Sequence, residues 1–173
     1  MKTDKKRKSL KNLEFSPGDY VVYPTHGVGQ VTGVEEREIS GQDLQLFIIN
    51  FEKERMILRV PIDKVEESGL RKLSSEKTIE IALKTLKGRV RIKRTMWSRR
   101  AQEYEAKINS GDPIAIAEVI RDLHRNADQP EQSYSERQMY QAALERLARE
   151  YAVCEDLDHD TAVEMMEASM SST

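Results

Sequence analysis

The side chains that could act in catalysis or bind a metal are few and widely spaced. The three histidines, His26, His124 and His159, match no H-x-x-x-H pattern. Cys154 lies near His159 in the sequence, but this pair supplies fewer ligands than a zinc site needs. We therefore predict no catalytic residues, no metal and no cofactor, and we expect Cys154 to pack as a small apolar side chain against a helical core.

The segment DLDHDTAVEMME has acids at the spacing of a calcium-binding loop. Asp156, Asp158, Asp160 and Glu167 occupy positions 1, 3, 5 and 12 of the EF-hand loop. Position 6, where the loop needs glycine for its sharp turn, is Thr161, and a helical pattern begins directly after Asp160. We interpret these acids as the N-terminal cluster of a helix, stabilised by the helix dipole, with calcium binding as the less favoured alternative.

The strongest functional pattern is a tryptophan inside a run of cations. Residues 84–100 hold eight Lys or Arg and no acid, and Trp97 is the only tryptophan of the chain. A solvated helix face usually interleaves acids with bases, so the unbalanced sign indicates contact with a polyanion. An apolar ring surrounded by cations is typical of proteins that unstack bases or grip single strands. The candidate DNA-binding residues are Trp97, Arg99, Arg100, Arg94, Lys93 and Arg91.

A second interpretation of the same tryptophan is structural. Trp97, Ala101, Tyr104 and Ile108 lie at i, i+4, i+7 and i+11, the spacing of a buried stripe on a helix that begins near Met96. Large aromatic side chains contribute most to cores, and the cations beside the ring would then form a solvated face. A ring at the first turn, with one edge on the helix and the other in solvent, would reconcile burial with its charged neighbours.

The apolar pattern divides the chain into a β half and a helical half. Residues 15–66 contain short β-rich runs between turns, and the strongest is LQLFIINF. The glycines of HGVGQVTG do not match a dinucleotide-binding G-x-G-x-x-G motif, so we interpret them as marks of a bent or bulged strand. This half fits a small SH3-like or Tudor-like β-barrel.

The second half has the periodicity of helices. Asp112 followed by Pro113 predicts a helix cap with proline in the first turn, and Ser133 with Glu136 predicts a capping box. We predict an α+β protein in which the barrel precedes a compact all-α domain of about five helices. The predicted boundaries are a disordered basic extension over residues 1–14, the barrel over 15–68 and the helical domain over 69–173.

The composition limits the cellular setting and hides a segregation of charge. The net charge is −2, yet residues 103–173 carry 16 acids against six bases. No apolar run approaches the roughly 20 residues that span a bilayer, and no apolar segment of a secretory signal follows the basic N-terminus. A single cysteine cannot form an internal disulfide. We expect a cytoplasmic protein that does not contact membranes.

Five motifs resemble, in order and spacing, the CarD family of bacterial transcription regulators, in particular its CdnL type. They are FSPGDYVVYPTHGVGQV, EEREISG, LRVP, MWSRR and SGDPIAIAEVIRDL. The similarity runs from about Phe15 to beyond Leu147. The barrel motifs alone also resemble the polymerase-binding module of transcription-repair coupling factors, and the helical half with Trp97 favours the CarD family.

The resemblance implies a non-enzymatic initiation regulator whose barrel binds the β subunit of RNA polymerase. Arg37 in EEREISG and Arg59 in LRVP match family arginines that contact polymerase. Ile39 and Leu58, from the same two motifs, complete the expected docking surface. We expect the protein to be a monomer.

The resemblance also implies that the helical domain binds promoter DNA at the upstream edge of the transcription bubble. Trp97 matches a family tryptophan that wedges into the minor groove, with little sequence specificity, and slows collapse of the bubble; Arg99 and Arg100 match basic residues that approach the DNA backbone. Met96 stands where relatives carry Asn, and Gln102 where some carry Lys, so the contacts of these two positions stay open.

Two other functions remain as alternatives. The first is a protein–protein adaptor that uses the barrel and the acidic helical region after residue 126 without touching DNA. The second is an enzyme with a concealed active site, which the lack of any clustered nucleophile, base or metal ligands disfavours.

Overall fold

The computed structural model describes residues 15–90, 94–126 and 128–171. The chain forms two compact units. One contains the residues up to Val21 together with Gly29–Lys72, and the other contains Val22–Val28 together with the residues from Leu73 onward. The predicted boundary between residues 68 and 69 stays a prediction, and the predicted disordered extension, residues 1–14, lies outside the described residues.

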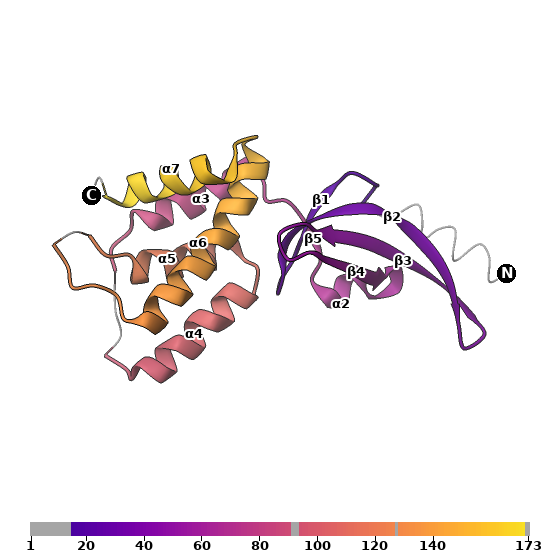
Figure 1. The fold of residues 1–173 in the computed structure, drawn as a ribbon, viewed down its shortest axis with the longest axis horizontal. Coiled ribbons are helices and arrows are strands. Elements are labelled where there is room, and N and C mark those ends of the chain that lie inside the picture. The colour runs from indigo at the N-terminus through magenta and orange to yellow at the C-terminus, as the bar shows by residue number, and fades with distance from the viewer. Residues whose placement is uncertain (1–14, 91–93, 127, 172–173) are drawn as a thin grey trace. The chain divides into compact units, whose positions relative to one another are not determined.

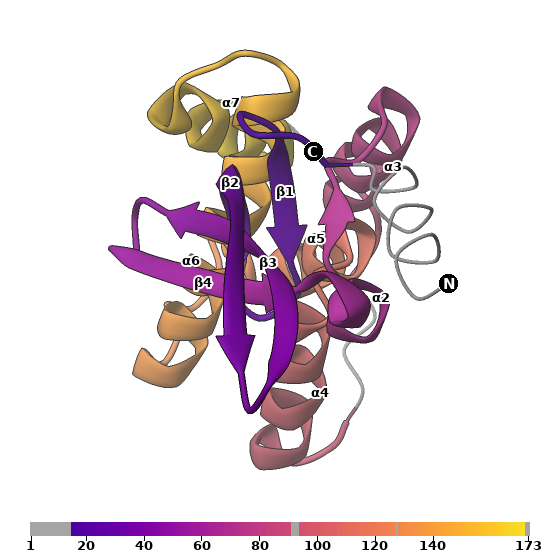
Figure 2. The same ribbon diagram turned by 90° about the vertical axis from the view of Figure 1, so that its right-hand side faces the viewer.

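A five-stranded sheet dominates the N-terminal half of the chain. Its strand order is β4-β3-β2-β1-β5, and β3 pairs antiparallel with both β2 and β4 (Figure 2). Among the described residues the sheet is open, because β4 and β5 lie at its two edges and do not pair. The predicted fold class is confirmed, with an open sheet instead of a closed barrel. The strands are β1 (Tyr20–Tyr23), β2 (Gly27–Ile39), β3 (Gln42–Phe51), β4 (Met56–Pro61) and β5 (Arg71–Lys72).

A tight turn and a bulge set the register of the long strands. Ser40 and Gly41 join β2 to β3, and both have positive φ, 53° and 78°, as a two-residue hairpin with the twist of its strands requires. The register of β2 on β3 shifts between Val31 and Gly33, so the predicted bulge is confirmed. Glycine at position 29 has a packing reason, since a Cβ there would lie 2.7 Å from the side chain of Ile49.

A short helical segment follows the fourth strand. It consists of a 3-10 turn, η1 (Ile62–Lys64), and one turn of α-helix, α2 (Val65–Ser68). Gly69, with φ of 77°, ends this helix in the left-handed conformation that glycine adopts without strain. The chain then enters β5.

Five longer helices form the second unit within the described residues, as predicted (Figure 1). The predicted caps are confirmed, because the Asp112 carboxylate accepts from Ile114 N–H and the Ser133 hydroxyl accepts from Glu136 N–H. Asp158, directly before the last helix, acts in the same way, since it accepts from the amide and the hydroxyl of Thr161. The helices are α3 (Glu76–Leu86), α4 (Trp97–Asn109), α5 (Pro113–Leu123), α6 (Tyr134–Cys154) and α7 (His159–Ser171).

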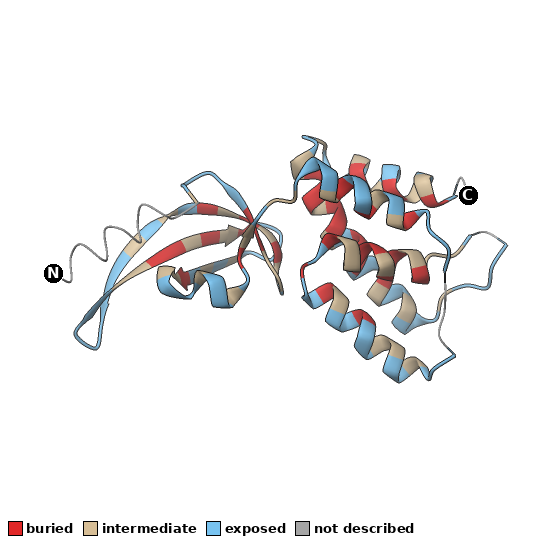
Figure 3. Ribbon diagram, turned by 180° about the vertical axis from the view of Figure 1, so that it is seen from behind, coloured by how far each residue is buried: buried red, intermediate tan, exposed pale blue. Residues whose placement is uncertain are grey.

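One apolar core joins these helices (Figure 3). Val119, Ile120 and Leu123 of α5 are fully buried, and α5 packs against α3, α4 and α6. Cys154 packs at the edge of this core, as predicted, and its thiol donates to the Ser74 carbonyl at 3.5 Å. Packing in this core holds the helices in place, including the start of α4, where Trp97 lies.

Candidate nucleic-acid and polymerase interfaces

The start of α4 has a rigid backbone and an unusual cap. Met96 occupies the N-cap position, and its side chain makes no capping hydrogen bond. Its carbonyl oxygen accepts from the backbone N–H groups of both Arg99 and Arg100, each at 3.1 Å. The first turn is thus held by backbone hydrogen bonds, while the Met96 side chain is 78% exposed.

Trp97 is the first residue of α4, and its indole is half-buried. The ring packs against the edge of the helical core, with its centroid 6.2 Å from that of Tyr104. Its Nε1–H donates to the hydroxyl of Ser135 in α6 at 3.3 Å. The indole is therefore anchored in the fold, as the structural interpretation expects. It is also still partly open to solvent, as the nucleic-acid interpretation requires.

Arg100 helps to anchor this tryptophan. Its guanidinium lies 5.4 Å from the centre of the Trp97 ring and 5.7 Å from that of Tyr104, which is the geometry of a cation–π contact. It also donates to the Tyr104 hydroxyl at 3.3 Å, and that hydroxyl faces the buried carboxylate of Asp122 at 3.4 Å. Arg121 pairs with the same carboxylate at 3.0 Å, so the acid does not remain unpaired in the core.

The remaining predicted cations divide into two groups. Arg94 and Arg99 are exposed, and within the described part of the chain neither has an acidic partner. Arg91 and Lys93 lie outside the described residues. The exposed positive charge beside Trp97 therefore comes from Arg94 and Arg99, whereas Arg100 is committed to the two aromatic rings.

The sequence did not reveal two residues near the tryptophan. Ser135 lies 38 positions from its indole partner, and no local pattern links them. Tyr134, the first residue of α6, is 78% exposed. An aromatic side chain directly after the Ser133 cap was the available signal, because the first helical turn often leaves its side chains in solvent.

The expected polymerase surface is organised around Glu35. Its carboxylate accepts from Arg37 Nε at 3.1 Å and from Arg59 Nε at 2.8 Å, which brings two predicted arginines from β2 and β4 together. These hydrogen bonds, first the one from Arg59 and then the one from Arg37, lower the pKa of Glu35. The bridge holds two cations side by side on the surface of the sheet.

The other two predicted polymerase contacts take no part in this ion-pair bridge. Ile39, at the end of β2, is half exposed at 49%. Leu58 neighbours Arg59 in β4, and successive strand residues point to opposite faces, so Leu58 shares the face of the buried Val60. The apolar residue on the face of Arg59 is Ile57, which is 56% exposed and which the sequence analysis missed.

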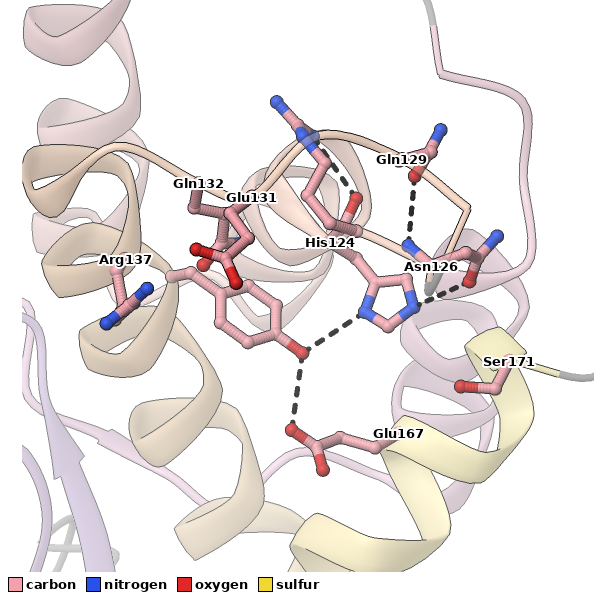
Figure 4. A pocket seen from close by; sticks show the side chains of 10 residues that line it. His124, Asn126, Gln129, Glu131, Gln132, Arg137, Glu167 and Ser171 are labelled. Atoms are coloured by element: carbon pink, nitrogen blue, oxygen red, sulfur yellow. Dashed lines mark hydrogen bonds between the residues drawn. The ribbon is translucent and has the colours of Figure 1, made fainter.

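A pocket of about 480 Å³ is lined by residues that follow α5 and by residues of α6 and α7. His124 Nδ1 lies 3.3 Å from the Tyr140 hydroxyl, which donates to Glu167 at 3.4 Å, and His124 Nε2 lies 3.2 Å from Asn126 Oδ1 (Figure 4). Burial, together with the nearby Glu167, raises the pKa of Tyr140 well above its ordinary value. The tyrosine therefore stays protonated at neutral pH and ties α7 to α6 without serving as a base.

Two further features concern metals and membranes. Among the residues that the structure describes, no group of three or more His, Cys, Asp or Glu side chains is placed to hold a metal ion. The hydrogen bonds from Thr161 lower the pKa of Asp158, in keeping with its role as a cap for α7. No helix in the described ranges is long and apolar enough to cross a bilayer.

The two halves of the chain match two models from one class of transcription regulators. Residues 15–74 match the CarD-like/TRCF RID domain, and residues 81–167 match the CarD C-terminal domain. The first implies an interaction with RNA polymerase, and CarD-like regulators are generally not enzymes. The chain therefore belongs to the CarD/CdnL family of transcription regulators.

Individual relatives agree with this assignment. The chain is 28% identical over 139 residues to the protein named "Putative transcription factor YdeB" of Bacillus subtilis, covering 80% of this chain and 91% of that protein. The solution NMR structure of the 72-residue N-terminal domain of Myxococcus xanthus CarD is 36% identical, covering 34% of this chain and 77% of that chain, with a TM-score of 0.30. CdnLNt from Myxococcus xanthus is 38% identical, covering 38% and 92%, with a TM-score of 0.32.

Proposed function

We propose that this regulator binds the β subunit of RNA polymerase through its sheet unit and stabilises the promoter open complex through Trp97. The observation that supports this most directly is the half-buried indole at the start of α4, next to the exposed cations Arg94 and Arg99. A ring fixed by its own fold pays little entropy when it meets a nucleotide, because it is already ordered.

On the DNA side, the anchored indole wedges into the minor groove at the upstream edge of the bubble. Arg94 and Arg99 contact phosphates, and Arg91 and Lys93 are further candidates. Arg100 acts indirectly, because its cation–π contact holds the indole in place. Ring faces and phosphates are common to all sequences, so this binding has little sequence specificity. Stabilising the open state by about 1.4 kcal/mol would change its population tenfold relative to the closed promoter.

On the polymerase side, Arg37 and Arg59 form the docking surface with Ile39, and Leu58 supports it from the opposite face of β4. Glu35 keeps the two guanidinium groups adjacent, which favours a partner with acidic side chains on its surface. Once the sheet unit is bound, the helical unit acts at an effective concentration of order mM. Intrinsic affinity for DNA can then be low, which suits a chain with a net charge of −2.

The lifetime of the open complex on purified polymerase tests this proposal. The wild-type protein should lengthen the lifetime, and Trp97→Ala should remove most of that effect while polymerase binding is retained. Trp97→Phe is the matched control, because it keeps an aromatic ring without the N–H donor and should retain part of the effect. A Trp97→Ala protein that unfolds, or one that stabilises the open complex as well as wild type, would contradict the wedge.

The protein–protein adaptor is the second candidate, and the excess of acids after residue 126 favours it. Binding of the helical unit to DNA should weaken as the salt concentration rises, whereas an adaptor that never touches DNA should show no salt-dependent DNA binding. The division of labour that we propose assigns residues 15–68 to polymerase and residues 69–173 to DNA, in a cytoplasmic monomer.

A further inference from the structure

The most exposed large apolar side chain at the start of α4 is not the tryptophan. Met96 is 78% exposed, whereas the indole of Trp97 is half-buried and held by Ser135 and Arg100. The backbone at Met96 is fixed, since its carbonyl accepts two hydrogen bonds. A flexible, polarisable thioether is therefore presented from a rigid position beside the ring.

A second protruding side chain lies at the start of the neighbouring helix. Tyr134 is also 78% exposed and is the first residue of α6, directly after the Ser133 cap. The indole N–H of Trp97 donates to Ser135, so the first residues of α4 and α6 lie against each other. Met96 and Tyr134 are each one residue away from this hydrogen bond, on different helices.

We propose that Met96, at the N-cap of α4, and Tyr134, at the start of α6, are additional nucleic-acid contacts. Their side chains meet unpaired bases next to the anchored indole. This inference rests on the proposed function and extends the site from one ring to three apolar side chains. The expected ligand is the junction between duplex and separated strands, where bases expose their faces. A buried duplex base would offer no such face.

The charges around the site favour a nucleic acid over an apolar protein partner. Arg94 and Arg99, both exposed, lie within three residues of Met96, and the described residues give them no acidic partner. The acids close to Tyr134 in the sequence are engaged elsewhere, since Glu136 of α6 pairs with Arg125 at 2.9 Å and Glu131, which precedes α6, lines the pocket that contains His124. Apolar side chains inserted between base steps and surrounded by cations are a recurring way to hold strands apart.

The test uses the full-length protein on polymerase open complexes with 2-aminopurine at the upstream end of the bubble. Tyr134→Ala should shorten the lifetime that the protein confers by at least about fivefold, the lower end of what one base stacked on an aromatic ring contributes. Met96→Ala should shorten it as well. Both should also lessen the change in 2-aminopurine fluorescence. Met165→Ala removes a half-exposed methionine from α7 and serves as the matched control, with no expected effect.

Two further measurements separate the possible causes. Tyr134→Phe keeps the ring and should behave as wild type if stacking is the contact. Acrylamide quenching of Trp97 should be the same in Met96→Ala, Tyr134→Ala and wild type, which shows that the indole has not moved. Unchanged lifetimes in both alanine variants, with a working wild-type protein, would overturn this inference alone. A wild-type protein without any effect on the lifetime would overturn the proposed function and this inference together.

Discussion

The hydrogen bond between Trp97 and Ser135 offers the sharpest test of how the indole is held. Ser135→Ala removes the acceptor and leaves the ring, the cations and the helix cap in place. The bond is solvent-exposed and 3.3 Å long, so its net contribution lies at the lower end for neutral pairs, about 0.5–1 kcal/mol. The ratio of docked to undocked indole should therefore fall by roughly two- to fivefold.

The remaining contacts keep this loss from being complete. The stacking of Arg100 on the ring contributes about 0.5–1 kcal/mol at such a site, and packing against the helical core adds to it. We therefore expect Ser135→Ala to shorten the lifetime of the open complex, but by less than Trp97→Ala. Ser135→Thr restores a hydroxyl at the same position and should recover most of the effect.

The assay is direct because the chain has one tryptophan, so intrinsic fluorescence reports this ring alone. Ser135→Ala should raise the acrylamide quenching constant and shift the emission to longer wavelength, while Ser135→Thr should stay close to wild type. If quenching and lifetime are both unchanged in Ser135→Ala, the serine does not hold the indole. If quenching rises while the lifetime stays at the wild-type value, the anchoring of the ring has no part in its action on DNA.

Two other substitutions test the sheet unit and the helical core. Arg59→Glu places a second carboxylate beside Glu35 and should abolish capture of the polymerase β subunit. Arg55→Glu reverses a charge in an exposed turn and should not affect capture. Equal capture by the two variants would exclude the bridge as the docking point. Burial raises the pKa of Tyr140, so above about pH 10 the unfolded chain loses a proton that the folded chain keeps, and stability should fall by about 1.4 kcal/mol per pH unit. Tyr140→Phe should be less stable at neutral pH and should lack this alkaline component in urea unfolding, and an identical pH profile would exclude Tyr140 as its source.

Local chemistry made much of the fold predictable. The caps at Asp112 and Ser133 and the bulge near Gly33 depend on residues a few positions apart, and the structure has all of them. Closure of the barrel depends instead on whether distant edge strands can pair. β5 is only two residues long and lies at the edge opposite β4, so the pattern of short strands could not show that the sheet stays open.

The site was predictable where it depends on sequence neighbours and unpredictable where it depends on packing. The exposed cations beside Trp97 follow from the unbalanced charge run, but the partner of its N–H comes from a helix 38 residues away. The contact of Arg100 with the two rings also depends on helix geometry, which brings residues three and four positions apart together on α4. Leu58 could have been placed correctly, since alternation along a strand separates it from Arg59.

The small number of exposed cations near Trp97 limits how strongly the helical unit can bind DNA. Within the described residues, Arg94 and Arg99 are the exposed positive charges closest to Trp97 in the sequence, so the helical unit should neutralise only a few phosphates. Each phosphate contact lowers affinity by about 3.5-fold when salt rises fourfold. Binding of the protein to forked DNA, followed through Trp97 fluorescence, should thus be weak and moderately salt-dependent in the absence of polymerase.

Arg99→Ala tests this count. It should reduce the slope of log affinity against log salt by about 0.9, the value for one phosphate contact, at every DNA sequence. Lys77→Ala removes the same charge from an exposed position in α3 and controls for the change in net charge. If both variants lower the slope equally, DNA senses only the overall field of the protein, and Arg99 makes no contact of its own. If neither lowers it, the cations beside the tryptophan do not face phosphates, and the adaptor becomes the better account of this chain.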